Sequence, residues 1–294
     1  MEIKGEITVM EVLSGKVAIV TGASLRGLDH ESKAGIGLTV AMDLAAQGAR
    51  IVLVDSTASV KAHPSFAPPS AAQLESSVRR LRDAGYDALG IDADVGNSAD
   101  VKRLMKTAVD RFGRLDILVN NAGLCILQPV LKMDEEVFDL SCRVMLKGTF
   151  LCSREAARIM IELGNGGRIV NISSILGKTG SLFCGAYSAA KAGIIGLSRV
   201  MSQEWATHGI TVNTICPGYI DTELLSGRGG ILDMGATLLD IDREKQERIL
   251  LGRVPLGRFG NPRDVSRMVA FLCSPDAAYI TGQAINIDGG AQMV

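Results

Sequence analysis

The sequence predicts an α/β fold built on a single doubly wound parallel sheet with helices on both faces. Short apolar segments alternate with longer amphipathic segments along the whole chain of 294 residues. The apolar segments, such as 51–54 and 117–119, contain no polar residue, which indicates strands that are buried on both faces and therefore parallel. Parallel strands need crossover helices between them, which the amphipathic segments supply. No linker or internal repeat interrupts the alternation, so residues 1–294 are predicted to form one domain.

In chain order, the predicted strands are 16–20, 51–54, 88–95, 117–119, 169–172, 211–215 and 284–287. The predicted helices are 37–47, 72–81, 100–112, 134–163, 187–207 and 262–273. Several of these helices stop at or near a glycine, which is typical of helix C-termini. Two segments, 24–34 and 56–70, lengthen the connections after the first and second strands. We expect both to be surface loops beside a ligand cleft, because ligands bind at the carboxyl ends of parallel strands.

Composition and charge exclude several classes of protein. The formal net charge of −1 argues against a nucleic acid or a membrane surface as partner, since either would require a basic patch. No apolar run approaches the roughly 18 residues of a membrane span, and the acidic first 15 residues do not resemble a signal peptide. Six cysteines without a CxxC pair and only three histidines predict no metal site. We therefore expect a cytoplasmic protein whose cysteines are buried.

A glycine-rich turn follows the first predicted strand. Gly22, Gly35, Ile36 and Gly37 lie where the chain passes from strand to helix, and backbone amides at such a helix N-terminus bind pyrophosphate. Ordinary turn glycines would give the same pattern. Asp55 strengthens the cofactor interpretation, because a carboxylate at the end of the second strand binds both ribose hydroxyls and repels a 2′-phosphate. The pattern predicts NAD as the cofactor.

Tyr187 and Lys191 lie four residues apart at the start of a predicted helix, so their side chains share one face. Lowering the tyrosine pKa from about 10 to about 7 requires about 4 kcal/mol, which a neighbouring ammonium and the positive nicotinamide would supply. Ser174, just past the strand 169–172, would hydrogen-bond a substrate oxygen and hold it against the phenol. A tyrosine and a lysine at this spacing are otherwise a surface pair. The serine at the preceding strand end favours an acid–base site.

Eight short motifs occur in one order along the chain: TG at 21–22, GIG at 35–37, DV at 94–95, NNAG at 120–123, NISS at 171–174, YSAAK at 187–191, PG at 217–218 and IDGG at 287–290. With them the chain resembles the short-chain dehydrogenases/reductases from about residue 14 to 290. The resemblance implies a Rossmann fold in which Ser174, Tyr187 and Lys191 are catalytic, and in which Tyr187 and Lys191 also contact the cofactor. It implies cofactor contacts for a further set of residues: Asp94 and Val95 at the adenine, Asn121, Ala122 and Gly123 along the cofactor floor, and Pro217, Gly218, Ile220 and Thr222 at the nicotinamide.

The chain departs from this family at three places. The glycine turn carries extra residues, and the 56–70 insertion is similar to one found in a subset of members that hold NAD tightly. The third departure is Met145, which stands where the family has an asparagine. In the family that asparagine holds a water linking the catalytic lysine to bulk solvent, and a thioether cannot replace it. Ser141, four residues earlier on the same predicted helix face, is the expected substitute.

The resemblance implies hydride transfer between NAD(H) and a secondary alcohol or ketone as small-molecule substrate. One alternative is a 3-oxoacyl-carrier-protein reductase, which residues 191–222 resemble. Asp55 weighs against this alternative, because those reductases generally use NADPH. A second alternative is an NAD-binding regulatory protein that has lost catalysis, and only Met145 favours it.

Residues 223–254 are expected to form a substrate lid, because they lie between the predicted nicotinamide-binding segment and the last helix. A partly disordered loop is the alternative. Gly227, Gly229 and Gly230 would provide hinge freedom, and an apolar lining would favour a hydrophobic or cyclic substrate; the expected lining residues are Leu224, Leu225, Ile231, Leu232 and Met234. The family resemblance also implies a homotetramer, with the long helices and the C-terminal strand at its interfaces.

Overall fold

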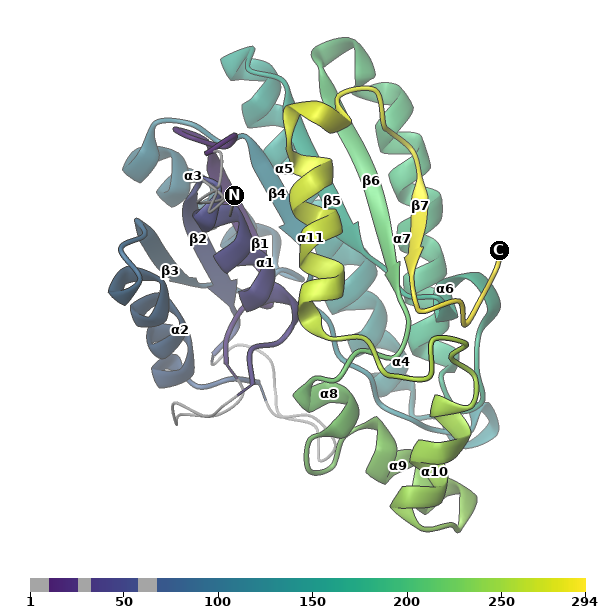
Figure 1. Ribbon diagram of the computed structural model, residues 1–294. Coiled ribbons are helices and arrows are strands. Elements are labelled where there is room, and N and C mark those ends of the chain that lie inside the picture. Colours follow the sequence, from purple (N-terminus) through teal and green to yellow (C-terminus); the bar gives the residue numbers. More distant parts are fainter. Residues whose placement is uncertain (1–10, 26–32, 58–67) are drawn as a thin grey trace, which may run out of the picture.

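The computed structural model describes residues 11–25, 33–57 and 68–294. Seven parallel strands form one sheet in the order β3-β2-β1-β4-β5-β6-β7 (Figure 1). The strands are β1 (Val17–Thr21), β2 (Arg50–Asp55), β3 (Ala88–Asp92), β4 (Ile117–Asn120), β5 (Gly167–Ile172), β6 (Ile210–Pro217) and β7 (Ala284–Ile287). The winding reverses between β1 and β4, which creates the crevice where ligands bind in such sheets. The predicted fold class is confirmed.

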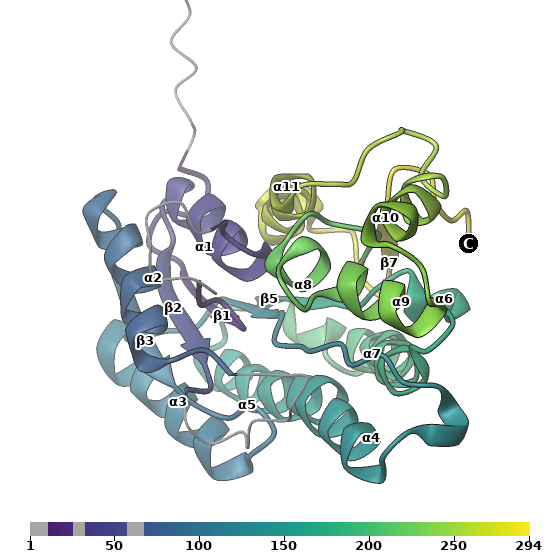
Figure 2. The same cartoon turned by 90° about the horizontal axis from the view of Figure 1, so that it is seen from below.

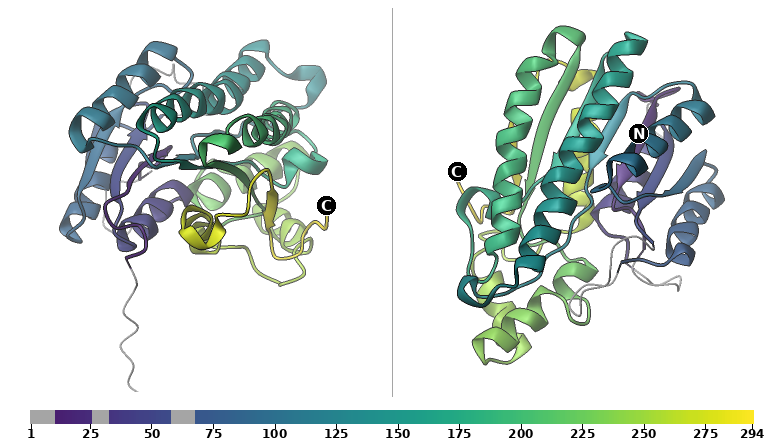
Figure 3. Two further views of the ribbon diagram at one scale, coloured as in Figure 1. Left: turned by 90° about the horizontal axis from the view of Figure 1, so that it is seen from above. Right: turned by 180° about the vertical axis from the view of Figure 1, so that it is seen from behind.

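Helices cover both faces of the sheet (Figures 2 and 3). One face carries α1 (Ile36–Ala46), α2 (Ala71–Asp83) and α11 (Pro262–Cys273), and the other carries α3 (Ser98–Phe112), α5 (Gly148–Leu163) and α7 (Gly185–Glu204). The packing of β2 explains why its residues 51–54 are all apolar. Ile51 and Leu53 pack against the helices on the first face, whereas Val52 and Val54 pack against those on the other face. Because successive side chains of a strand point to opposite faces, a strand covered on both sides must be apolar throughout.

Most predicted elements differ from the observed ones by one or two residues at an end, and three differ more. The strand expected over 88–95 ends at Asp92, and the chain then turns, with the carboxylate of Asp94 accepting a hydrogen bond from the Gly96 amide. The helix expected over 134–163 consists of α4 (Glu135–Ser141), a π-helical segment η2 (Cys142–Lys147) and α5. Helix α7 starts two residues early and stops at Glu204, before a 3₁₀ turn, η3 (Ala206–His208). The remaining short helices are α6 (Leu176–Thr179), η1 (Val130–Lys132) and η4 (Pro275–Ala277).

The section after β6 is helical, which the sequence did not predict. It forms α8 (Glu223–Ser226), α9 (Ile231–Leu239) and α10 (Arg243–Leu251) below the carboxyl ends of the strands (Figure 1). Arg243 joins all three helices: it donates to the carbonyl oxygen of Ser226 at 2.6 Å and pairs with Asp233. We call residues 223–251 the helical lid.

The sequence also predicted that the cysteines are buried and that the two insertions are surface loops. Five of the six cysteines are buried, but Cys142 is only half-buried, because it lies on the π-helical segment near the molecular surface. No helix in the described part of the chain is both long and apolar enough to cross a bilayer. Most of the two inserted loops, residues 26–32 and 58–67, lies outside the described residues.

Candidate active site

Two adjoining cavities open at the carboxyl ends of the strands. The first, which we call the switch-point cavity, measures about 990 Å³ and lies where β1, β2, β3 and β4 end. The second, which we call the tyrosine cavity, measures about 1300 Å³ and lies between the ends of β4, β5 and β6 and the helical lid. Five residues line both cavities and form their common wall: Ile36, Asn121, Gly123, Thr222 and Leu224.

The glycine turn is built for close backbone packing. A Cβ atom at Gly22, whose φ is +66°, would lie 2.6 Å from the Cα of Ala122, and one at Gly37 would lie 2.5 Å from the carbonyl oxygen of Gly22. Only glycine fits either position. Gly35 caps the N-terminus of α1, and a Cβ there would meet nothing within 4 Å. The residues predicted to approach a pyrophosphate therefore do line the switch-point cavity, although Gly22 and Gly37 are also required by the packing.

Asn121 fastens this turn to the end of β4. Its side-chain amide donates to the carbonyl oxygens of Thr21 at 3.0 Å and Gly22 at 2.8 Å. The backbone amides of Asn121 and Ala122 both donate to the Thr21 hydroxyl at 3.0 Å. These bonds fix the spacing between β1 and β4 at the floor of the cavity.

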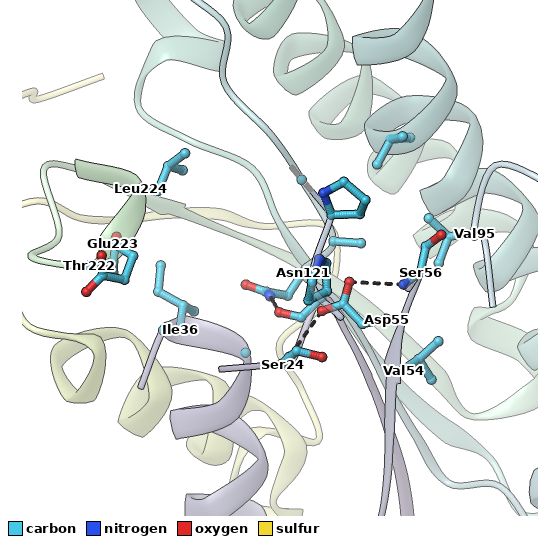
Figure 4. Close-up of a pocket in the computed structure, with 18 of the residues that line it drawn as sticks. Ser24, Ile36, Val54, Asp55, Ser56, Val95, Asn121, Thr222, Glu223 and Leu224 are labelled. Atoms are coloured by element: carbon cyan, nitrogen blue, oxygen red, sulfur yellow. Dashed lines mark hydrogen bonds between the residues drawn. The ribbon is translucent and has the colours of Figure 1, made fainter. Parts of the chain in front are cut away.

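Asp55 ends β2 and faces the switch-point cavity (Figure 4). Its two carboxylate oxygens accept hydrogen bonds from the backbone amides of Ser24, at 3.1 Å, and Ser56, at 3.0 Å. Ser24 lines the same cavity, and its hydroxyl oxygen is buried and has no hydrogen-bond partner among the described residues. A buried hydroxyl without a partner costs free energy, so this position fits a polar ligand group.

Asp94 and Val95 also line the switch-point cavity, but the carboxylate of Asp94 is already engaged. It forms an ion pair with Arg143 on the π-helical segment and accepts from the Gly96 amide at 2.8 Å. Asp94 therefore holds the wall of the cavity in place. The sequence did not reveal Arg143, because 49 residues separate the two partners.

Lys33 and Asp221 tie the two sides of the cleft together. The Lys33 ammonium donates to the Asp221 carboxylate at 2.9 Å, and this hydrogen bond raises the pKa of Lys33. Asp221 also accepts from the Ser226 hydroxyl at the end of α8. Lys33 lines the switch-point cavity, so its charge there is largely compensated.

These features fit the adenosine half of a dinucleotide. The cavity offers a carboxylate at a strand end, a helix N-terminus without a side-chain cap and a buried hydroxyl that lacks a partner in the described part of the chain. No group of three or more histidine, cysteine, aspartate or glutamate side chains in the described ranges is placed to hold a metal ion.

Ser174, Tyr187 and Lys191 all line the tyrosine cavity. Ser174 follows β5, and its hydroxyl oxygen accepts from the Leu176 amide at 3.1 Å. Tyr187 lies in the first turn of α7 and Lys191 lies one turn later. The structure thus brings together the three side chains that the sequence placed on one strand end and one helix.

Two contacts hold α7 against the chain that follows β5. The hydroxyl of Ser173 donates to the carbonyl oxygen of Lys191 at 2.8 Å. A Cβ atom at Gly177 would lie 2.8 Å from the carbonyl carbon of Lys191, so only glycine permits this approach. Ser173 and Gly177 are positioning residues that the sequence reasoning missed, although Ser173 belongs to the NISS motif.

Burial dominates the electrostatics of Tyr187 and Lys191. Burial raises the pKa of Tyr187, and the hydrogen bond with Ser174 lowers it only in part. Burial also lowers the pKa of Lys191 to about 8. The Lys191 ammonium lies 5.5 Å from the centre of the Tyr187 ring. The predicted lowering of the tyrosine pKa combines the Lys191 ammonium with the positive nicotinamide, so it stays a prediction for the protein with its cofactor bound.

Met145 is fully buried and packs against Tyr187, Ala190 and Ile194 on α7. A Cβ at Gly123 would lie 3.5 Å from the Met145 sulfur and 3.6 Å from the Lys191 nitrogen. The Met145 thioether and the Lys191 ammonium therefore both lie beside Gly123. Ser141 is buried too, but it is not among the described residues that line the tyrosine cavity. The π-helical segment begins directly after Ser141, and the proposed relay through Ser141 stays a prediction.

The end of β6 and the segment after it form another part of the tyrosine-cavity wall, and the lining residues there are Pro217, Gly218, Ile220 and Thr222. The Gly218 amide donates to the Ile287 carbonyl oxygen at 3.0 Å, and a Cβ at Gly218 would lie 2.7 Å from the Cβ of Asp288. The IDGG motif therefore supports this wall from outside. Thr222 is the N-cap residue of α8, where the helical lid begins.

The helical lid supplies much of the apolar lining. Of the five residues expected there, Leu224, Leu225 and Ile231 line the tyrosine cavity. Leu232 instead packs inside the lid against Leu225 and Leu250, and Met234 packs beside the cavity wall. The sequence reasoning did not foresee several other lining residues: Cys125, Leu127, Phe183, Cys184, Leu239, Gln246, Ile249 and Arg253.

Comparison with known proteins agrees with this architecture. A family model described as Enoyl-(Acyl carrier protein) reductase matches residues 31–292. A 3-oxoacyl-[acyl-carrier-protein] reductase of Synechocystis is 35% identical over 285 residues, which are 97% of this chain and 100% of that protein. A solved short-chain type dehydrogenase/reductase of Mycobacterium marinum is 30% identical, with a TM-score of 0.80 and coverage of 97% and 98% of the two chains. An actinorhodin polyketide ketoreductase solved with NADPH is 32% identical, with a TM-score of 0.82 and coverage of 94% and 97%.

Proposed function

The chain belongs to the short-chain dehydrogenase/reductase family and is an oxidoreductase of carbonyl and alcohol groups, and we propose that it transfers a hydride between NAD(H) and a secondary alcohol or ketone. One observation carries the proposal. Ser174, Tyr187 and Lys191 line a largely apolar cavity that shares a wall with the cavity containing Asp55. A nicotinamide at the shared wall would lie beside Tyr187 while its adenosine lies beside Asp55.

The residues of the switch-point cavity would bind the dinucleotide. Asp55 would accept hydrogen bonds from both adenosine ribose hydroxyls and would repel a 2′-phosphate. The N-terminus of α1 would face the pyrophosphate, with Gly35 leaving room for it. When bound, the nicotinamide supplies the hydride acceptor or donor.

The residues of the tyrosine cavity would move the proton. In the reduction direction the Tyr187 hydroxyl gives its proton to the carbonyl oxygen, while the Ser174 hydroxyl donates a hydrogen bond to the same oxygen. Oxidation reverses the transfer. Lys191, held beside Tyr187 by the Ile172 carbonyl oxygen, would contact the nicotinamide ribose. Its positive charge, together with that of oxidised nicotinamide, would offset the desolvation of the phenolate.

A second candidate is reduction of 3-oxoacyl groups carried by a carrier protein. The name and full-length match of the Synechocystis relative favour it. Asp55 would favour NAD over NADP by repelling a 2′-phosphate, whereas the similar ketoreductase was solved with NADPH. A regulatory protein without catalysis is disfavoured, because Ser174, Tyr187 and Lys191 are all present in one cavity.

The proposal includes a homotetramer. The outer faces of α5 and α7 expose Phe150, Ile161 and Val200, and exposed apolar side chains on adjacent helices are typical of subunit interfaces. Light scattering coupled to size-exclusion chromatography measures the mass. A monomeric mass at micromolar concentration contradicts this part of the proposal.

The experiment that tests the function is a substrate panel assayed with both nucleotides. We expect NAD reduction with cyclic or apolar secondary alcohols and NADH oxidation with the matching ketones, measured at 340 nm. Acetoacetyl thioesters distinguish the second candidate. Turnover of those thioesters with NADPH, and of no free alcohol with NAD, contradicts the proposal.

A further inference from the structure

The tyrosine cavity is lined by positive charge and by no negative charge. Lys191 and Arg253 line it, whereas no aspartate, glutamate or histidine is among its described lining residues. The acidic side chains lie instead in the neighbouring switch-point cavity, which Asp55, Asp94 and Glu223 line. A cleft lined by charge of one sign attracts a ligand of the other sign. The proposed function gives Lys191 a role and leaves Arg253 without one.

Arg253 brings its charge to the tyrosine cavity from the end of the helical lid. It follows α10 by two residues, and Ile249 and Leu250 of that helix line the same cavity. Within the part of the chain that the structure describes, its guanidinium makes one hydrogen bond, to the Tyr219 hydroxyl at 3.4 Å, and pairs with no carboxylate. Arg253 is exposed, so a ligand can reach the N–H groups that this long bond leaves unused.

Tyr219 places a second donor beside this guanidinium. Tyr219 is half-buried and also lines the tyrosine cavity, and its ring lies 6.3 Å from that of Phe259, measured between the ring centres. Because the Tyr219 oxygen accepts from Arg253, its own O–H group remains available as a donor. A planar guanidinium fork and a hydroxyl donor together suit the two oxygens of a carboxylate, whose single charge matches that of one arginine.

The rest of the cavity on the lid side is apolar. The lining residues there include Leu224, Leu225, Ile231, Leu239, Ile249 and Leu250. Burying a carboxylate among such side chains costs free energy unless a charged partner compensates it. Arg253 and Tyr219 supply that compensation at one place. Neither is hydrogen-bonded to Ser174 or Tyr187 in the described structure, so this place is separate from the reacting carbon.

We propose that Arg253, together with Tyr219, binds a carboxylate group of the substrate and thereby determines substrate specificity. The substrate class is then an oxo acid, or the corresponding hydroxy acid, in which an apolar chain separates the carboxylate from the reacting carbon. This inference rests on the proposed function and narrows its substrate.

The test compares oxo acids with their uncharged methyl esters. The probes are 5-oxohexanoate, 7-oxooctanoate and 9-oxodecanoate, which differ in the length of chain between the ketone and the carboxylate. For at least one chain length, we expect the wild-type protein to favour the acid over its ester at least about tenfold in kcat/KM with NADH. Because Arg253 acts away from the reacting carbon, the preference should appear in KM rather than in kcat. Added salt should weaken it, since the guanidinium is exposed.

Three variants test whether Arg253 causes the preference. Arg253→Gln removes the charge and should bring the ratio of acid to ester close to one. Arg253→Lys keeps the charge without the planar fork, and its ratio should lie between those of Arg253→Gln and the wild type. Arg248→Gln is the control and should leave the ratio unchanged, because Arg248 is exposed on α10 and does not line the cavity. A preference for the acid that survives in Arg253→Gln overturns the inference.

Binding measured separately from turnover distinguishes a failure of this inference from a failure of the proposed function. Calorimetry with the acids and esters is carried out on Tyr187→Phe protein saturated with NADH, with and without Arg253→Gln. If no probe is turned over but an acid binds at least about tenfold tighter than its ester through Arg253, the inference stands and the proposed function fails. If acids and esters are turned over equally well at every chain length, the proposed function stands and the inference is overturned. Equal binding, or no binding, without turnover also overturns it.

Discussion

The ammonium group of Lys191 donates a hydrogen bond of 2.7 Å to the carbonyl oxygen of Ile172, the last residue of β5. The lysine is 4% exposed, and its nitrogen meets a backbone dipole rather than a carboxylate. Such a dipole compensates a buried charge only in part, which is why burial lowers the pKa of Lys191 to about 8. The geometry thus fixes the ammonium beside Tyr187 at a cost in stability.

The first prediction follows from that cost. The folded-state pKa of Lys191 is about 8 and its unfolded value is near 10.5, so the unfolded chain binds more protons between these pH values and stability rises with pH there. Lys191→Met removes the buried charge. It should raise the free energy of unfolding by about 2 kcal/mol at pH 7, and the gain should shrink as the pH approaches 10.5. Urea unfolding at pH 7 and pH 10 measures both values.

The control for this prediction is Lys147→Met, since Lys147 is exposed. Its effect on stability should be small and similar at the two pH values. A Lys191→Met variant that is less stable than the wild type at pH 7 would show that the hydrogen bond to Ile172 outweighs the desolvation of the ammonium.

The second prediction concerns proton transfer. Tyr187→Phe removes the hydroxyl and keeps the ring, so kcat should fall by at least about 10²-fold while the affinity for NAD stays nearly constant. Steady-state kinetics and fluorescence titration with NADH measure the two quantities. Tyr279→Phe is the control, because Tyr279 is fully exposed and should leave both unchanged. Most of the activity surviving in Tyr187→Phe would contradict the mechanism.

The third prediction concerns the ionisation of Tyr187. Because burial raises its pKa, the hydroxyl should stay protonated in the cofactor-free protein well above pH 10. The difference in tyrosinate absorbance at 295 nm between wild type and Tyr187→Phe should therefore be flat up to about that pH. Saturating NAD should produce a step at lower pH, because its positive ring favours the phenolate. A step near neutral pH without NAD would show that Lys191 alone suffices.

The fourth prediction concerns the choice of cofactor. Asp55 should make kcat/KM at least about tenfold higher with NAD than with NADP, and Asp55→Ala should narrow the ratio. Lys33 should not rescue NADP binding, since its ammonium is paired with Asp221. Asp92→Ala is the control: Asp92 ends the adjacent strand, is exposed and does not line the cavity. A wild-type kcat/KM that is higher with NADP than with NAD would contradict the role assigned to Asp55.

The fifth prediction concerns Ser141, which precedes η2, and Met145, which lies within it. Ser141→Ala should lower kcat several-fold, because Ser141 is the expected substitute for the family asparagine in the proton relay. Met145→Ala should destabilise the protein by about 2–5 kcal/mol, because it empties a fully buried site against α7. Stopped-flow kinetics and urea unfolding measure these effects. A kcat of Ser141→Ala within about twofold of the wild-type value would contradict the serine relay.

The sequence alone determined the fold class and the members of the candidate trio. Uninterrupted apolar runs such as Ile51–Val54 require cover on both faces of a sheet, and that local property is enough to predict parallel strands. Tyr187 and Lys191 share a face because helix geometry fixes their spacing. Asp55 lies at the end of β2, and the neighbouring strands β1 and β3 end beside it. Each of these predictions depends on residues close together in the chain or on the common edge of the sheet.

Only the tertiary structure decided the lid, the π-helical segment and the state of the charged groups. Helices α8, α9 and α10 have 4, 9 and 9 residues, which is too short for independent stability, so contacts such as those of Arg243 hold them. The pairs Arg143–Asp94 and Lys33–Asp221 join residues 49 and 188 positions apart. Gln246 is buried where α10 meets α9 at Gly235. Local sequence encodes periodicity, whereas burial and pairing depend on which distant segments pack together.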